Sequence, residues 1–117
     1  MTDGKLTVIV GGSLEDDAAA FIDAWKRAEQ GESFEERQLA FESWHTLMRV
    51  LTPKRYDLLR HVHRHPAASV AALARDLDRD YRRVHEDVKI LAETGLLDRD
   101  GRGIHADYDE ISTRIAI

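Results

Sequence analysis

The stretch "SVAALARDLDRDYRRVHEDVKILAETGLL", residues 69–97, decides the fold of this chain. Ser69 is a helix-capping residue type in front of the apolar-periodic segment "VAALARDL". Asp78 is a second capping residue, and the spacing after it predicts a longer helix over residues 79–94, which Gly95 ends. The stretch therefore predicts two helices joined by a tight turn.

The longer helix has two different faces. Apolar residues at steps of three or four predict a buried face made of Tyr81, Val84, Val88 and Leu91. The other side is charged and carries Arg79, Arg82, Arg83, Glu86 and Lys89. At i,i+4 spacing we expect Arg82 to pair with Glu86, and Arg83 with Asp87. Exposed helical pairs are worth only a few tenths of a kcal/mol, so either pair could release its arginine to a phosphate.

The same pattern extends to both sides of this stretch. Thr52 can cap a helix that has Pro53 at its first position and runs to His65, where Pro66 stops it. Its predicted core face is Tyr56, Leu59 and Val62, with Leu58 as a further candidate. Downstream, "LLDR" and "IHA" flank "DGRG", which predicts a β-hairpin with Arg102 near its tip.

The first 50 residues predict an α/β segment. Strand signals occur at 5–10 and, more weakly, at 36–41, and a helix is expected over 14–30 between Ser13 and Gly31. Ser43 can cap a short helix after the second strand. The alternation of Ile111, Thr113, Ile115 and Ile117 predicts a last strand. We expect the two terminal strands to pair, with each other or across subunits, because an unpaired edge is a liability.

Composition narrows the class of protein. The chain has no cysteine, which excludes a disulfide framework and a thiolate metal site. The N-terminus has no basic leader or cleavage site, and no apolar run could span a bilayer, so we expect a cytoplasmic protein without membrane contact. The net charge of −5 falls entirely in residues 1–50, while residues 51–117 are neutral.

The order helix, short helix, turn, longer helix and hairpin resembles the MarR/ArsR-like winged helix-turn-helix transcriptional regulators. The resemblance rests on "SVAALARDL", "RDYRRVHEDVKILAETGLL" and "DRDGRG", and it is nearest to small prokaryotic predicted regulators with an N-terminal α/β extension. It implies an α+β, mainly helical chain with three parts. These are an α/β extension over 1–50 for dimer or partner contacts, a winged helix-turn-helix over 51–106, and a C-terminal strand segment over 107–117.

The resemblance also implies a function and a set of residues. A homodimer would bind double-stranded DNA in a sequence-specific way and act as a repressor, without catalytic activity, cofactor or metal. The implied contacts to bases or phosphates come from Ser69, Arg79, Arg82, Arg83, Glu86, Lys89 and Arg102. Arginine suits this role because its planar guanidinium binds guanine or phosphate in a bidentate way.

Several alternatives stay open at this stage. The charged helix face could be only a solvated surface, and winged helices also serve as protein-interaction modules. The acidic first half favours an antitoxin-like variant that binds a partner protein there and an operator through the second half. His61 and His65 stand four residues apart and could share a metal ion, although a solvated helix end explains them better. "VIVGGSLEDD" lacks the lysine of a phosphate-binding loop and predicts a plain turn.

Overall fold

A computed structural model describes residues 4–11 and 36–117 and shows a small α+β protein. The helix expected over 14–30, with its caps, and Trp25 lie outside the described residues. The chain divides into two compact units, one of residues 1–47 with 108–117 and the other of residues 48–107. No helix among the described residues is both long and apolar enough to cross a bilayer.

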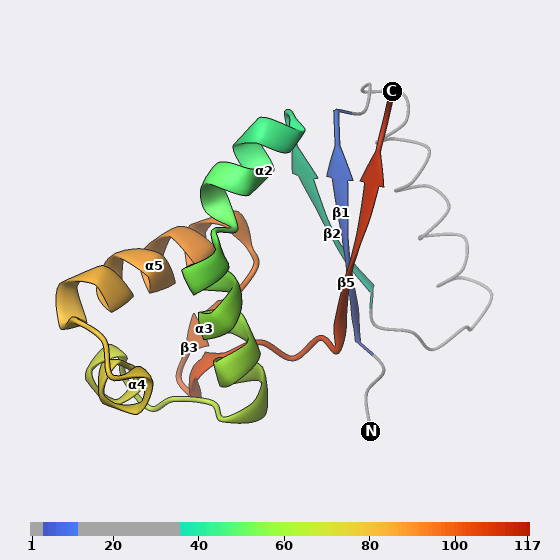
Figure 1. The fold of residues 1–117 in the computed structure, drawn as a ribbon. Coiled ribbons are helices and arrows are strands. Elements are labelled where there is room, and N and C mark those ends of the chain that lie inside the picture. The colour runs from blue at the N-terminus through green and yellow to red at the C-terminus, as the bar shows by residue number, and fades with distance from the viewer. Residues whose placement is uncertain (1–3, 12–35) are drawn as a thin grey trace, which may run out of the picture. The chain divides into compact units, whose positions relative to one another are not determined.

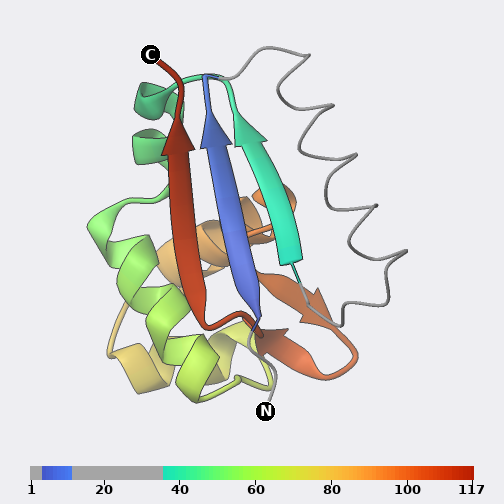
Figure 2. The same cartoon turned by 90° about the vertical axis from the view of Figure 1, so that its right-hand side faces the viewer.

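The first unit contains a three-stranded sheet. Its strands are β1 (Lys5–Val10), β2 (Glu36–Phe41) and β5 (Glu110–Ile115), in the order β2-β1-β5. Both pairings of β1 are parallel, and Figure 2 shows the three arrows side by side and pointing the same way. Alternate residues of the central strand, Leu6, Val8 and Val10, are fully buried. The expectation that the two terminal strands pair with each other is confirmed.

The second unit is mainly helical. Helix α2 (Trp44–Val50) leads into it, and α3 (Pro53–Arg64), α4 (Val70–Leu77) and α5 (Tyr81–Thr94) follow. A hairpin of β3 (Asp98–Asp100) and β4 (Gly103–His105) completes it. In Figure 1, α4 is seen along its axis below α5. The core of the unit is made of Leu58, Leu59, Val62, Val70, Leu73, Val84, Val88, Leu91, Leu96, Leu97 and Ile104.

Most of the predicted helix ends are confirmed. The Thr52 hydroxyl accepts the Arg55 N–H at 3.3 Å with Pro53 at the first helical position, and the Ser69 hydroxyl accepts the Ala72 N–H at 3.1 Å. Ser43 caps α2 in the same way through the Thr46 N–H. Gly95 ends α5 at φ 89°, a left-handed conformation that suits glycine.

Two aromatic residues that the helical spacing placed in the core are at the surface. Tyr56 is 45% exposed, and Leu58 takes the core position beside Leu59. Tyr81 is 52% exposed, because it is the first residue of α5 and the core begins only one turn later, at Val84. An apolar stripe fixes which face of a helix is buried, but not where along the helix the core ends.

The hairpin is joined to the rest of its unit through the backbone. Ala67, just after α3, forms a bridge with Ile104 of β4 through two hydrogen bonds of 2.9 and 2.7 Å. Gly103 lies at φ 106°, and a Cβ there would collide with the backbone of Ala67. The close approach of these two chain segments therefore requires glycine at this position.

Candidate nucleic-acid interface

The turn between α4 and α5 consists of Asp78, Arg79 and Asp80. Asp78 adopts the left-handed conformation at φ 51°, and its N–H donates to the carbonyl of Arg75. The Arg79 N–H donates to the carbonyl of Ala74 at 3.0 Å. These bonds satisfy the last carbonyls of α4 and fix the direction in which the chain leaves it.

The start of α5 differs from the prediction. Asp80, and not Asp78, is the N-cap, and its Oδ2 accepts the Arg83 N–H at 3.2 Å. The expected start at residue 79 with Asp78 as cap is therefore wrong by two residues. Asp78 is instead the C-cap of α4, because aspartate tolerates the left-handed conformation better than most residues do. As a result Arg79 lies in the turn and not on α5.

A buried carboxylate connects this turn to its surroundings. Asp87 is only 8% exposed. The Arg79 guanidinium donates to its Oδ2 at 2.7 Å, and the Arg55 guanidinium donates to its Oδ1 at 2.9 Å. Arg55 also donates to the carbonyls of Arg49 and Val50, both at 3.0 Å. This Asp87 cluster therefore links the end of α2, α3, the turn and α5.

The Asp87 cluster overturns one expected ion pair and explains the position of Arg79. Asp87 binds Arg55 and Arg79, so it does not form the predicted i,i+4 pair with Arg83. The Arg79 side chain is 17% exposed and turned into the protein, away from solvent. Such a buried pair contributes more to a defined geometry than to net stability, because desolvation offsets much of the attraction.

The other charged residues of α5 are at the surface. Arg82, Arg83, Glu86 and Lys89 are all exposed, and in the part of the chain that the structure describes none of their side chains forms an ion pair. The predicted Arg82–Glu86 pair is therefore absent. Arg82, Glu86 and Lys89 share one face of the helix, since they are spaced by four and three residues. This face offers Arg82 and Lys89 to an external anion, and Arg83 is exposed next to it.

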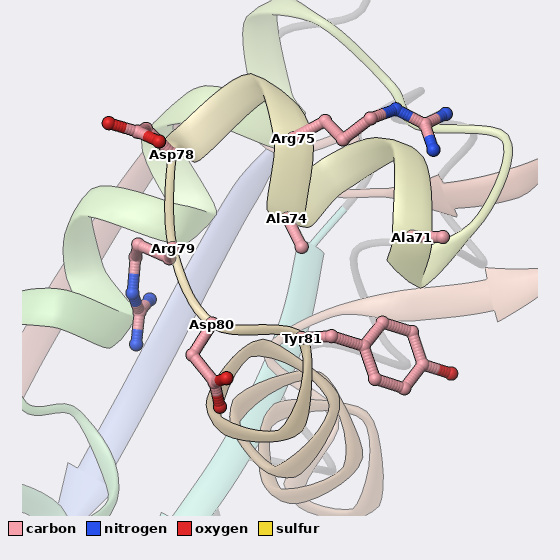
Figure 3. A pocket seen from close by; sticks show the side chains of 7 residues that line it. All are labelled: Ala71, Ala74, Arg75, Asp78, Arg79, Asp80 and Tyr81. Carbon is pink, nitrogen blue, oxygen red and sulfur yellow. The ribbon is translucent and has the colours of Figure 1, made fainter.

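A shallow hollow of about 550 Å³ lies between α4 and α5, lined by Ala71, Ala74, Arg75, Asp78, Arg79, Asp80 and Tyr81. Figure 3 shows Arg75 and Tyr81 extended on one side of it, with Ala71 between them, and Asp78 and Arg79 on the other side. The Tyr81 ring also lies 5.9 Å from that of His85. The sequence analysis did not identify Arg75 and Tyr81 as surface groups beside this turn. For Tyr81 there was a signal, because a cap at Asp80 makes Tyr81 the first residue of α5 and leaves it at the surface.

The remaining predicted contacts lie at two other places. Ser69 is exposed at the start of α4, where its hydroxyl accepts a backbone N–H of the helix. Arg102 is at the turn of the β3–β4 hairpin, and its side chain is 73% exposed. Its Nη2 lies 3.4 Å from Asp107 and 3.7 Å from Asp100, close enough for weak exposed ion pairs. The structure thus brings four of the seven predicted residues together on α5.

His105 is a buried titratable group inside the hairpin. Its Nδ1 lies 2.9 Å from Oδ2 of Asp107, and its Nε2 lies 2.9 Å from Oδ2 of Asp100. Burial alone would lower the pKa of His105, but the hydrogen bonds to Asp100 and Asp107 outweigh it and the pKa is raised. The hydrogen bond to His105 lowers the pKa of Asp100 in turn. Nothing in the sequence spacing had pointed to this group.

The histidines that raised the question of a metal ion are held in other ways. The rings of His61 and His65 lie 5.4 Å apart, and His61 Nε2 is 3.6 Å from a carboxylate oxygen of Asp76. His63 Nδ1 is 2.7 Å from the carbonyl oxygen of Ala106. His61 and His65 are therefore neighbours of each other, whereas His63 is bound to a different part of the chain.

Comparison with known proteins assigns this chain to a protein family. The family model HVO_A0114 matches residues 50–113, which is more than half of the chain. The protein therefore belongs to the HVO_A0114 family. The match runs from the end of α2 through the three following helices and the hairpin into β5. No curated protein and no solved structure matches the chain.

Proposed function

We propose that this protein is a cytoplasmic winged helix-turn-helix regulator that binds double-stranded DNA in a sequence-specific way. In this proposal α4 and α5 are the helix-turn-helix, α5 is the recognition helix and the β3–β4 hairpin is the wing. The observation that carries it is the start of α5, where Arg82 and Arg83 are exposed and form no ion pair within the described residues. An arginine without an internal partner can bind a base edge or a phosphate.

The geometry of α5 supports binding in the major groove. A recognition helix inserts its N-terminal half and keeps one face on its own domain. Val84, Val88 and Leu91 supply that inner face, and all three are fully buried. Arg82 and Arg83 stand in the first turn, at the end that would enter the groove. Glu86 is one turn further and could accept from a cytosine amino group.

The side chains around the hollow would contact the DNA backbone, so they would position the protein on the duplex without reading the base sequence. Arg75 and Tyr81 extend on the same side of the motif, where a phosphate could accept from a guanidinium and a phenol. Ser69 and Lys89 would make similar contacts to phosphates of the DNA. At the wing, Arg102 would reach the minor groove or its phosphates. Arg79 also lines the hollow, but its guanidinium holds Asp87 and fixes the turn, so we assign it no contact with DNA.

We also propose that the protein acts as a homodimeric repressor related to the MarR/ArsR-like regulators. Strands β2 and β5 form the two edges of the described sheet, and an edge strand offers unpaired backbone groups to a second chain. Two recognition helices related by a two-fold axis would read half-sites about one helical turn apart. A strictly monomeric protein at tens of micromolar in light scattering would contradict the dimer.

A protein partner is the second candidate function. Trp44, on α2, is 47% exposed, and exposed tryptophan is enriched at protein interfaces. Together with the acidic first half of the chain, it favours an antitoxin-like arrangement in which a partner binds outside the helix-turn-helix. A Trp44→Ala variant should then lose the partner in a pull-down from the native host while keeping any DNA binding.

The decisive experiment for DNA binding lets the protein select its own binding sequence. The full chain is used to select duplexes from a random pool, and binding to the selected duplex and to random duplex is measured by fluorescence anisotropy at several salt concentrations. A regulator should prefer the selected sequence by roughly a thousandfold or more, and its affinity should fall steeply with salt. If no binding occurs even at low salt, the protein-partner function is favoured instead.

A further inference from the structure

Three side chains that can bind metal ions lie close together at the hairpin, around His105. Asp98 and His105 are directly opposite each other in the antiparallel register of β3 and β4. Asp107 follows His105 by two residues. One ligand atom from each of these three side chains lies within 4.8 Å of the others. His105 is buried, Asp98 is half-buried and Asp107 is exposed, so the group is open to solvent on one side.

The two nitrogens of His105 make this group different from ordinary surface acids. Each nitrogen faces a carboxylate oxygen at 2.9 Å, Nδ1 that of Asp107 and Nε2 that of Asp100. A neutral imidazole has only one N–H, so it can donate to only one of the two. The other nitrogen would direct its lone pair at a negative oxygen. With the residue only 4% exposed, the ring needs a second positive charge beside that oxygen, which either a proton on the ring or a metal ion bound to the nitrogen supplies.

We propose that the hairpin binds a divalent transition-metal ion of the zinc class through His105 Nδ1 and the carboxylates of Asp98 and Asp107. Two carboxylates and one imidazole with an open fourth position suit Zn²⁺ and disfavour Mg²⁺ and Ca²⁺, which prefer oxygen ligands alone. Ligand atoms around a tetrahedral zinc ion lie about 3.3 Å apart, given bonds of about 2.0–2.2 Å. The His105–Asp107 contact is already near that spacing, and the remaining atoms have to close in modestly.

Asp100 completes the arrangement from the other side of the ring. When Nδ1 binds the ion, Nε2 carries the proton and donates it to Asp100 at the observed 2.9 Å. Histidine ligands are commonly oriented in this way by a carboxylate that does not touch the metal. Arg102 lies 3.4 Å from Asp107 and would give up that contact, so its exposed side chain must turn outward. Ion binding by these residues does not require that the protein binds DNA.

The test uses the full chain after removal of metal with a chelator. Zn²⁺ alone is titrated into it by calorimetry, and Co²⁺ replaces Zn²⁺ to report tetrahedral coordination through its visible absorption. We expect one ion per chain, with affinity weakened at least tenfold by Asp98→Asn and about tenfold by Asp100→Asn. Because His105→Gln could unfold the hairpin, Asp98→Asn carries the test, since it leaves both hydrogen bonds of His105 in place.

A double variant, His61→Gln with His65→Gln, is the matched control, because these two histidines lie close together and are separate from the proposed site. It should bind Zn²⁺ like the unaltered protein. In ¹⁵N spectra the His105 Nδ1 resonance should shift when the ion is added. The proposal is overturned if Asp98→Asn binds Zn²⁺ as tightly as the unaltered protein. It is equally overturned if only the double variant loses Zn²⁺ binding. Weak binding of several ions per chain, in place of one ion, would also overturn it.

Discussion

The guanidinium of Arg79 donates to the carboxylate of Asp87 over 2.7 Å and joins the turn of the α4–α5 pair to the buried side of α5. This contact separates the arginines of the motif into two groups. Arg79 fixes the turn, whereas Arg82 and Arg83 are exposed on the first turn of α5. The proposed DNA-binding surface therefore depends on a carboxylate that it does not contain.

Replacing that carboxylate should be costly for stability. Asp87→Asn leaves the guanidiniums of Arg55 and Arg79 largely buried without their counter-charge, and breaking a buried pair in this way costs about 3 kcal/mol. The free energy of unfolding, measured by urea titration, should fall by that amount. Asp57→Asn, at an exposed position on α3, is the control and should change it by about 0.5 kcal/mol or less. Equal effects of the two variants would show that the Asp87 cluster does not organise the unit.

Two glycines of the hairpin should respond differently to alanine. Gly103→Ala places a Cβ against the Ala67 backbone at φ 106° and should cost about 2 kcal/mol or more, because a left-handed alanine is itself strained. Gly101→Ala, two residues away, meets nothing within 4 Å and should be nearly neutral. Thermal unfolding of the two variants checks this. A neutral Gly103→Ala would mean that the Ala67–Ile104 bridge is not formed.

The two aspartates of the α4–α5 turn should give changes of opposite sign. Asp80→Ala removes the cap of α5 and should destabilise the protein by about 1 kcal/mol. Asp78→Gly relieves a left-handed non-glycine residue and should stabilise it by about 0.5–1 kcal/mol. Urea titrations of both variants decide the assignment. If Asp78→Gly were the destabilising change, the cap would be at the position that the sequence first suggested.

The sequence predicted the order of the helices and strands well because the signals involved are local. Thr52, Ser69 and Gly95 each act on backbone groups a few residues away, so their residue types alone indicate helix ends. The hairpin was predicted for the same reason. The order and direction of β2, β1 and β5 could not be predicted, since they depend on pairings between distant segments.

The candidate site was predictable only in part. Arg82, Arg83, Glu86 and Lys89 are exposed as the helical period predicted. The partner of Asp87 was predicted wrongly, because Arg55 is 32 residues away and no spacing rule connects them. A charged residue between Val84 and Val88 on the buried face was nevertheless a visible sign of an internal ion pair. His105 became notable only when the hairpin register brought it opposite Asp98.

The most direct test of the DNA-binding account compares three arginine variants on one selected duplex and on random duplex. Arg82→Ala and Arg83→Ala should each weaken binding to the selected duplex by about 1–3 kcal/mol, and at least one should reduce preference for it over random duplex. Arg114→Ala, at an exposed arginine of β5, should leave both affinities unchanged. If all three variants bind the selected duplex as tightly as the unaltered protein does, α5 is not a recognition helix.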